Sequence, residues 1–194
     1  RSGSSRLKFS HRLNRKERKM SGKLPVEGEK LAEFRYRLKF SVDEVIYDFF
    51  EIQLQFGLRF ADCESLSIAQ ARYCLRHGTI DILEAKTGKV RKCDSNEVVD
   101  EIFRRRVGGE TLWSGMVHRT TYAAKLKMVA VACGLDPARI STHSVRKSFA
   151  VAKRDAGVPI ELISEQMLHD SVETTRIYCG FNEKKVRGIT ATSI

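Results

Sequence analysis

The sequence predicts a mainly α-helical domain with a small three-stranded antiparallel sheet, an α+β fold. Apolar residues recur at helical spacing over most of the chain. Residues 71–93 instead alternate apolar and polar side chains and are divided by glycine-containing turns. The chain has 194 residues, of which 42% are hydrophobic and 30% charged, so it is long enough to bury one well-packed core.

Two longer helices and a short one are predicted before the sheet. Pro25 suits the first turn of a helix that continues to Leu38. Ser41 is the candidate N-cap of the second helix, which Gly57 ends. The apolar stripe of this second helix, which we expect in the core, consists of Val45, Phe49, Ile52 and Phe56. Residues 61–66 form the short helix.

The predicted sheet follows between residues 71 and 93. Alternation around Tyr73–Leu75 predicts a first strand and alternation around Ile80–Ile82 a second, joined by a turn at His77-Gly78. The segment Lys86-Thr87-Gly88-Lys89 makes another turn before a third strand at Val90–Cys93. Three short antiparallel strands are the simplest sheet that this pattern allows.

Helical spacing resumes after residue 95 and continues toward the end of the chain. The predicted helices begin near residues 98, 122, 142, 160 and 172. Ser141 or Thr142 is the N-cap candidate of the third of these, and Ser171 that of the last, which ends at Gly180. The chain therefore reads as helical on both sides of the sheet.

Composition favours an acidic polymer as the partner of this protein. The formal net charge is +11, which suits nucleic acid, although ribosomal and membrane-surface proteins are equally basic. The five cysteines are odd in number and lack a C-x-x-C pair, which argues against a zinc site or a disulfide framework and for a reducing compartment. No apolar run reaches the length of a membrane span, and no signal peptide is apparent, so we expect neither membrane insertion nor export.

The last third of the chain holds the residues with the most chemical information. His143 and Arg146 share one helix face near its N-terminus, where phosphate is favoured. Arg146 precedes His169 by 23 residues, and His169 precedes Tyr178 by 9. Arginine fits phosphate bidentately, histidine can move a proton, and tyrosine can act as a nucleophile. Together these residue types suit the attack of a tyrosine hydroxyl on a phosphodiester.

This order and spacing resemble the catalytic domain of the tyrosine recombinase (phage integrase) family, over about residues 24–182. That family has a His-x-x-Arg pair, a second His about two dozen residues later and a nucleophilic Tyr nine residues after that. Arg59 lies in Gln55–Asp62, which is similar to the family's T-G-L-R-x-x-E segment. Lys86 lies in a K-T-G-K segment, with Lys89 as the alternative.

One departure from the family pattern concerns the residue before the second His. The family usually has Leu-Gly-His, whereas this chain has Met167-Leu168-His169. The change puts a side chain where the backbone normally turns tightly.

The resemblance implies a set of roles for the matched residues. Tyr178 attacks one DNA phosphate without a metal ion or other cofactor, forming a 3′-phosphotyrosyl bond and releasing a 5′-hydroxyl. The phosphate is held by Arg59, Arg146 and His169. His143 manages the tyrosine proton, and Lys86 protonates the leaving oxygen. Further candidates for contact with DNA are Lys89, Arg119, Lys125, Lys147 and Arg176.

The resemblance also implies partners and a division of the chain. The partner is double-stranded DNA, on which family members assemble as tetramers that join two sites, in the cytoplasm or nucleoid of a bacterial, archaeal or phage-infected host. Residues 1–23 form a flexible basic lead-in or linker, 24–182 the catalytic domain and 183–194 a C-terminal tail. Two alternatives remain open: a type IB topoisomerase that relaxes DNA, and a non-catalytic DNA-binding module of the same fold.

Metal-dependent and nucleotide-hydrolysing enzymes have weaker support in the sequence. The chain contains no H-E-x-x-H motif, no carboxylate cluster with the spacing of a two-metal nuclease and no Walker-type phosphate loop. We therefore expect no metal site.

Overall fold

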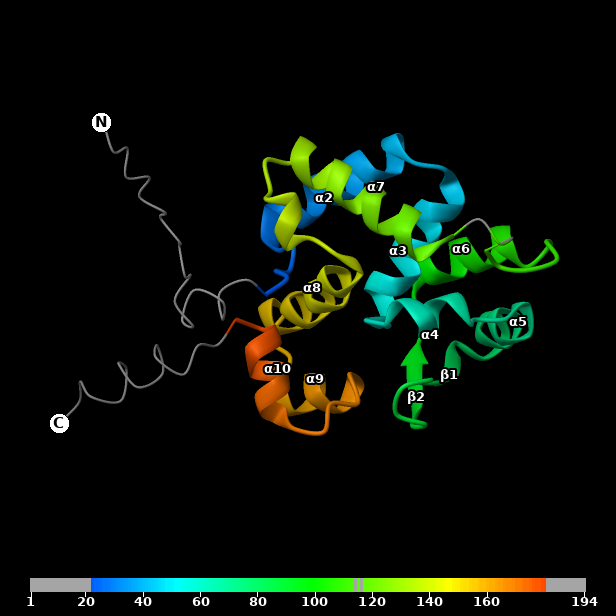
Figure 1. The fold of residues 1–194 in the computed structure, drawn as a ribbon. Helices are drawn as coiled ribbons and strands as arrows, with labels where there is room; N and C mark the ends of the chain where they lie inside the picture. Colours follow the sequence, from blue (N-terminus) through cyan, green and yellow to red (C-terminus); the bar gives the residue numbers. More distant parts are fainter. Residues whose placement is uncertain (1–21, 114, 116, 181–194) are drawn as a thin grey trace, which may run out of the picture.

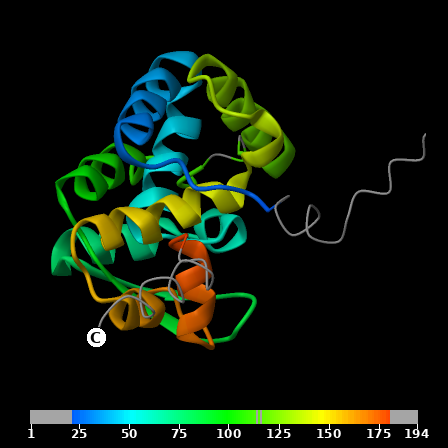
Figure 2. The ribbon, with the colours of Figure 1, turned by 90° about the vertical axis from the view of Figure 1, so that its left-hand side faces the viewer.

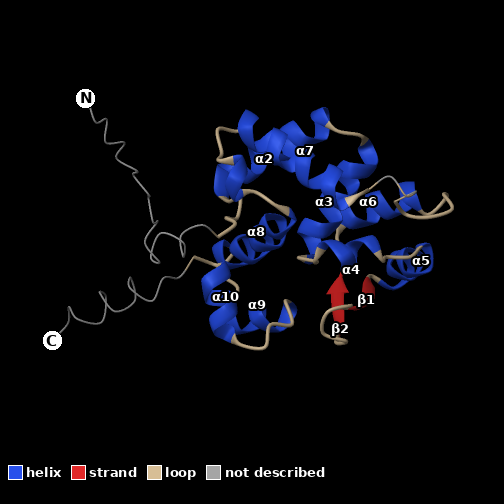
Figure 3. Cartoon of the chain, in the orientation of Figure 1, coloured by secondary structure: helices blue, strands red, loops and turns tan. Residues whose placement is uncertain are grey.

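The computed structural model describes residues 22–113, 115 and 117–180, so the predictions for residues 1–21 and 181–194 fall outside the described part. Figure 3 shows that helices make up most of this region and that the strands lie at one side. The elements are, in chain order, α2 (Gly28–Ser41), α3 (Glu44–Phe56), α4 (Phe60–Glu64), α5 (Ile68–His77), β1 (Thr79–Leu83), β2 (Val90–Asp94), α6 (Glu97–Arg106), α7 (Arg119–Ala132), the short 3₁₀ helix η1 (Pro137–Arg139), α8 (Thr142–Asp155), α9 (Ile160–Gln166) and α10 (Val172–Tyr178).

Helix α3 forms the centre of the fold. Ten of its thirteen residues are buried, and it contacts α2, α4, α6 and α8. The predicted apolar stripe of this helix is buried throughout, as expected. In Figures 1 and 2, α2 and α7 cover one side of α3, while α8 separates this layer from α9 and α10. None of the described helices is long and apolar enough to cross a membrane.

The prediction of three strands is wrong, because the described part of the chain forms a two-stranded antiparallel sheet. Tyr73 and Leu75 lie in helix α5 instead of a strand. A capping box between Ser67 and Gln70 begins this helix, and Gly78 ends it with a φ of 70°. The alternation of two apolar residues was too short to distinguish a strand from a helix face, whereas the capping box favours a helix that begins at Ile68.

The remainder of the predicted hairpin is confirmed. Strands β1 and β2 pair with Ile80 opposite Cys93 and Ile82 opposite Arg91. The segment Lys86-Thr87-Gly88-Lys89 connects them, as the turn signals indicated. Strand register places Ile80, Ile82 and Arg91 on the buried face.

Helix boundaries differ from the prediction in the first part of the chain. Pro25 precedes α2, and Ser41 is its last residue, so Asp43 takes the N-cap position of α3. The later caps are as predicted: Ser141 accepts a hydrogen bond from the amide of His143, and Ser171 caps α10.

A buried polar network joins the segments that carry the candidate site residues. The side-chain amide of Gln53 in α3 donates to the carbonyl oxygens of Leu58, at 3.1 Å, and Thr142, at 3.2 Å. The hydroxyl of Tyr122 donates to the Gln53 carbonyl oxygen at 2.7 Å. Leu58 precedes Arg59 and Thr142 precedes His143, so one fully satisfied side chain fixes both segments beside α3.

Gly57 is required both by backbone geometry and by packing. Its φ is 63°, and a Cβ there would lie 2.4 Å from Cδ1 of Phe149. The tight turn leaves its carbonyl oxygen free to accept hydrogen bonds from Arg146, at 2.8 Å, and from Arg91, at 3.2 Å. The turn after α3 thus brings together residues of β2 and α8.

A second apolar cluster joins the last three helices. It consists of the buried residues Phe149, Ala150, Ile163, Met167 and Cys179. Tyr178 packs against this cluster and is only partly buried. The apolar contacts therefore fix α10 on α8 while one side of Tyr178 remains accessible.

Candidate active site

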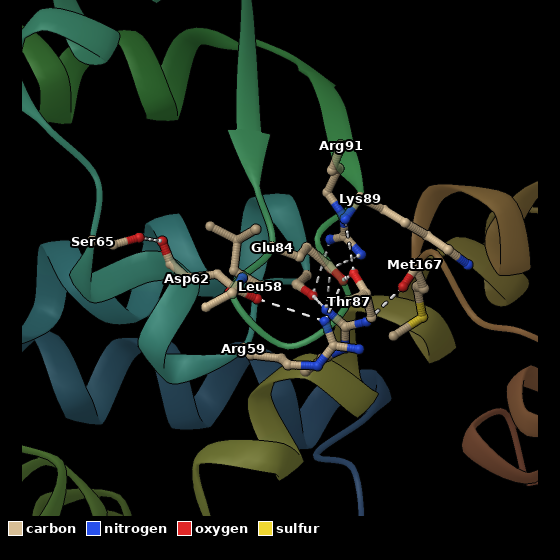
Figure 4. Close-up of polar contacts among 12 residues, drawn as sticks. Leu58, Arg59, Asp62, Ser65, Glu84, Thr87, Lys89, Arg91 and Met167 are labelled. Atoms are coloured by element: carbon tan, nitrogen blue, oxygen red, sulfur yellow. Dashed lines mark hydrogen bonds and ion pairs between the residues drawn. The ribbon is translucent and has the colours of Figure 1, made fainter.

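Three arginines meet around one buried carboxylate, that of Glu84 (Figure 4). Arg59 donates a short hydrogen bond to Glu84 Oε2. Arg146 Nη1 lies 3.4 Å, and Arg91 Nη2 3.3 Å, from Glu84 Oε1. Arg146 and Arg91 are almost fully buried, whereas the Arg59 side chain is 19% exposed. A cationic cluster therefore opens to solvent through Arg59.

Arg146 is held by backbone oxygens from two distant parts of the chain. Its Nη1 donates to the carbonyl oxygen of Gly57, and its Nη2 donates to that of Met167 at 2.6 Å. Burial, followed by the charges of Arg91 and Arg59, lowers the pKa of Arg146 to about 10. The guanidinium remains charged at neutral pH, so a fixed cation lies at the turn that precedes His169.

His169 and Tyr178 lie side by side at α10. Their rings pack edge to face with centroids 4.9 Å apart. His169 Nδ1 lies 2.8 Å from the hydroxyl oxygen of the buried Thr175. A Tyr178 phenolate would raise the pKa of Arg146, so these two side chains lie within electrostatic range. The ammonium of Lys147 lies 5.2 Å above the Tyr178 ring.

His169 is neutral at physiological pH. Burial, and then the charges of Arg146, Arg59 and Arg91, lower the pKa of His169 from about 6.5 to about 4. A Thr175 hydroxyl that donates to Nδ1 leaves the other ring nitrogen, Nε2, protonated and free to donate. His169 is then a neutral hydrogen-bond donor beside Tyr178.

The lowered pKa of His169 predicts a loss of folding stability in mild acid. Between pH 6.5 and 4 the unfolded state binds a proton at this residue that the folded state does not, so stability falls as pH falls. We expect the free energy of unfolding of the wild type to fall by on the order of 2 kcal/mol more than that of His169→Gln between pH 7 and pH 4. This figure allows for the screening of a partly exposed ring. Urea unfolding at several pH values measures this difference. Parallel curves for the two proteins would contradict the prediction.

Leu168 adopts the backbone conformation that the family's glycine suggests. Its φ is 48°, and it is the one non-glycine residue with a positive φ in the described part of the chain. The amide of His169 donates to the carbonyl oxygen of Ser164 at 3.1 Å, which closes the end of α9. The tight turn before His169 is therefore kept although glycine is replaced, at the cost of a left-handed leucine.

Two substitutions at Leu168 isolate this backbone strain. We predict that Leu168→Gly is more stable to unfolding than Leu168→Ala by about 1 kcal/mol, because glycine adopts a positive φ without a steric penalty. At the control position Met128, within helix α7, we expect the opposite order: Met128→Ala should be more stable to unfolding than Met128→Gly by about 1 kcal/mol. Urea unfolding of the four variants tests both differences. An alanine variant that is the more stable at both positions would show that Leu168 is unstrained.

His143 lies on the solvent side of the cluster, at the start of α8. The residue is exposed, and its amide donates to the Ser141 hydroxyl at 3.2 Å. Burial of part of the ring, followed by the charges of Arg119 and Arg146, lowers the pKa of His143. The lowered pKa favours the neutral imidazole of His143, which is the form that can accept a proton.

The structure does not bring Lys86 into contact with the other candidates. Lys86 is exposed on the β1–β2 turn, and it makes no hydrogen bond or ion pair with any described residue. Its neighbour Thr87 donates to Glu84 Oε2 at 3.1 Å, so the turn itself is attached to the arginine cluster. Lys89 forms a 2.8 Å ion pair with Asp170, which makes it a component of the turn's contact with the α9–α10 loop.

The remaining DNA-contact candidates lie in different environments. Arg119 is exposed at the start of α7, and Lys125 is half-buried in the same helix. Arg176 is exposed on α10 and forms a 3.7 Å ion pair with Glu173. Lys147 donates to the carbonyl oxygen of Lys23 at 2.6 Å and lies over Tyr178. Of this group, Lys147 lies in contact with the candidate nucleophile.

Sequence reasoning missed Glu84, Arg91 and Thr175. Glu84 comes directly after β1 and continues the buried alternation of Ile80 and Ile82, and Arg91 lies opposite Ile82. Charged residues at inward positions of a strand are a signal that the alternation already contained. Thr175 could have been found as the residue one helical turn before Cys179 on the buried face of α10.

The described residues contain no group of three or more His, Cys, Asp or Glu side chains that could hold a metal ion. The polar groups that converge here are guanidinium groups, imidazoles, a phenol and the buried carboxylates of Glu84 and Asp62. Such groups bind a phosphate and move protons.

Comparison with known proteins gives relatives in sequence and in structure. The model of the Phage integrase family matches residues 29–185. The tyrosine recombinase XerD of Rickettsia prowazekii is 37% identical over 65 residues, which are 34% of this chain and 21% of that protein. This chain therefore spans about a fifth of the XerD protein that it matches.

Two solved structures share the fold. The XerH site-specific recombinase bound to its difH substrate aligns with a TM-score of 0.66 at 18% identity, over 88% of this chain and 55% of XerH. The catalytic domain of bacteriophage HP1 integrase aligns with a TM-score of 0.61 at 16% identity, over 88% of this chain and 95% of that domain. The fold is thus that of a recombinase catalytic domain, and it confirms the mainly helical prediction.

Proposed function

The chain belongs to the phage integrase family, and from this membership we propose that it cleaves and rejoins DNA strands through a covalent bond between Tyr178 and a DNA 3′-phosphate. The observation that carries the proposal is the convergence of three side chains: the Tyr178 ring packs against His169, and Arg146 binds the Met167 carbonyl oxygen two residues before His169. A nucleophile, a fixed cation and a neutral donor are what phosphoryl transfer to a tyrosine requires.

The proposed reaction exchanges one phosphoester bond for another. The Tyr178 oxygen attacks phosphorus, and the bond from phosphorus to the 5′-oxygen breaks. His143 takes the phenol proton, for which its lowered pKa leaves it neutral and available. Lys86 donates a proton to the leaving 5′-oxygen. Attack by a 5′-hydroxyl then reverses the step, so the phosphoester bond energy is conserved.

We assign the binding of the scissile phosphate to Arg59, Arg146 and His169. Arg59 contributes the exposed edge of the arginine cluster, and Arg146 contributes a cation fixed by Gly57 and Met167. The transition state carries more negative charge than the substrate, so prepositioned cations stabilise it selectively. His169 adds a hydrogen bond without adding charge.

We further propose duplex DNA as the substrate and a tetramer on two DNA sites as the active assembly. The net charge of +11 supports a polyanionic substrate, and the similar XerH was solved with its difH substrate. Exposed cations for the DNA backbone include Arg119 and Arg176. Residues 24–182 then form the catalytic domain, and localisation follows the DNA, in cytoplasm or nucleoid.

A nicked suicide duplex tests the proposed chemistry. Cleavage near the nick releases a short fragment that diffuses away, so the protein remains attached to the DNA 3′-end. We expect an adduct that survives denaturing electrophoresis, with the DNA linked to the peptide that contains Tyr178. DNA binding without an adduct would instead identify a non-catalytic module.

A second assay separates a recombinase from a topoisomerase. Two duplexes with different labels are incubated with the protein, and a supercoiled plasmid is incubated in parallel. Strand exchange between the duplexes supports the recombinase. Plasmid relaxation without exchange would support the topoisomerase and overturn the recombination proposal.

A further inference from the structure

Glu84 occupies a position that connects the hairpin to the arginine cluster. It follows strand β1, and its amide donates to the carbonyl oxygen of Lys89 at 2.9 Å. Its own carbonyl oxygen accepts hydrogen bonds from the amides of Thr87, at 3.3 Å, and Gly88, at 2.9 Å. The backbone of Glu84 thus closes the turn on which Lys86 lies, while its side chain points to the arginines (Figure 4).

Both oxygens of the Glu84 carboxylate contact the candidate active site. Oε2 accepts from Arg59 and from the Thr87 hydroxyl. Oε1 lies between Arg146, at 3.4 Å, and Arg91, at 3.3 Å. One carboxylate therefore links two phosphate-binding candidates from α8 and the α3–α4 turn to the turn that carries Lys86.

The electrostatics show that this carboxylate is charged. Burial alone would raise the pKa of Glu84, but the hydrogen bond from Arg59 and the charges of Arg91 and Arg146 outweigh burial and lower it. Without this negative charge, three guanidinium groups would repel one another in a mostly buried site. A second buried carboxylate, that of Asp62, lies 3.6 Å from Arg59 Nη1. Among the described residues, Glu84 is the carboxylate that forms ion pairs with Arg59, Arg91 and Arg146 together.

Burial distinguishes a supporting carboxylate from one that imitates the substrate. A carboxylate in the place of the scissile phosphate would have to be reachable from solvent. Glu84 is fully buried, and the exposed part of the cluster belongs to Arg59. Glu84 therefore lies behind the arginines, on the side away from the incoming DNA.

We propose that Glu84 is a positioning residue that holds Arg59, Arg146 and the Lys86 turn in one fixed arrangement for the scissile phosphate. The inference rests on the proposed cleavage of DNA by Tyr178. It adds to that function a residue that contacts no substrate atom and acts through the arginines it binds.

Two substitutions at Glu84 and one matched control test the inference. Glu84→Gln keeps the shape and removes the charge, whereas Glu84→Asp keeps the charge and withdraws it by one methylene. Glu51→Gln is the control, because Glu51 is equally buried and forms a bidentate ion pair with Arg35, at 2.8 Å for both hydrogen bonds, in another part of the fold. Circular dichroism and urea unfolding establish the folded fraction of each variant.

Single-turnover cleavage of the suicide duplex and equilibrium DNA binding are then measured separately. For the folded proteins we expect cleavage to slow by about 100-fold or more in Glu84→Gln and by about 10-fold in Glu84→Asp, with DNA affinity unchanged or higher, since a negative charge is lost or withdrawn. Glu51→Gln should cleave at the wild-type rate. Wild-type or faster cleavage by either Glu84 variant would overturn the proposal, and if Glu84→Gln does not fold, Glu84→Asp decides.

A measurement without DNA separates this inference from the proposed function. Absence of a wild-type adduct would overturn the function but leave the positioning role to be decided by nuclear magnetic resonance of the arginine Nε–H groups. We expect the Arg59 and Arg146 signals to shift and broaden in both Glu84 variants and to be unchanged in Glu51→Gln. Identical Arg59 and Arg146 signals in all proteins would overturn the positioning role.

Discussion

Replacing Tyr178 by phenylalanine is expected to abolish the covalent protein–DNA adduct. The substitution removes one oxygen atom, the proposed nucleophile, and leaves the ring that packs against His169 and the α8–α10 cluster. Loss of a nucleophile reduces catalysis by at least about 10⁴-fold, so no adduct should be detected within hours on the suicide duplex. Denaturing electrophoresis of labelled DNA measures the adduct directly.

The same substitution should leave folding and DNA binding almost unchanged. The Tyr178 hydroxyl makes no hydrogen bond with any described residue, so its removal leaves no described donor or acceptor unpaired. Tyr36→Phe makes the identical chemical change at a side chain that is 68% exposed, and it should cleave at the wild-type rate. An adduct formed by Tyr178→Phe would show that another residue is the nucleophile.

The sequence predicted the outline of the site because its chemistry is carried by residue types at fixed spacing. His143 and Arg146 lie in α8, Tyr178 lies in α10, and His169 lies in the loop between α9 and α10, so their proximity follows from a few short connections. The position of Arg59 could not be predicted in this way, because its place beside Arg146 depends on Gly57 and on the buried side-chain amide of Gln53. The hydrogen bonds from Arg146 to Gly57 and from Gln53 to Thr142 each connect residues 89 positions apart, and no local sequence pattern indicates them.

The errors have physical causes that are equally specific. The Tyr73–Leu75 alternation covered too few residues to distinguish the period of a strand from that of a helix, and the Ser67 cap was decisive. Glu84 was missed because hydrophobic alternation was used only to find the strand. A charged residue that continues the buried side of such a pattern must have partners, and here those partners are the arginines.

The Leu168 departure shows how a substitution can preserve a function-bearing turn. The sequence places a leucine side chain where the backbone normally turns tightly, and the positive φ of Leu168 shows that the turn is kept in a strained conformation. The strain is tolerated because Arg146 binds the Met167 carbonyl oxygen and the Ser164 carbonyl oxygen accepts from His169. One contact holds Met167, directly before Leu168, and the other holds His169, directly after it.

Replacing Arg146 by lysine should slow cleavage by about 10²- to 10⁴-fold while the positive charge is retained. Nη1 of the guanidinium donates to the Gly57 carbonyl oxygen and lies beside Glu84, while Nη2 donates to the Met167 carbonyl oxygen. A lysine ammonium is a single point and cannot span these acceptors. The fixed cation beside Tyr178 would therefore be lost although the net charge is not.

The variant separates geometry from charge only if folding is measured with cleavage. Loss of buried hydrogen bonds should reduce the free energy of unfolding by about 1–3 kcal/mol, which urea unfolding reports. Arg35→Lys is the matched control, because Arg35 also binds a buried carboxylate, that of Glu51, outside the site. We expect it to lose stability without a slower cleavage step. If Arg146→Lys cleaves at the wild-type rate, positive charge alone suffices at this position, and the fixed fork of hydrogen bonds has no part in the reaction.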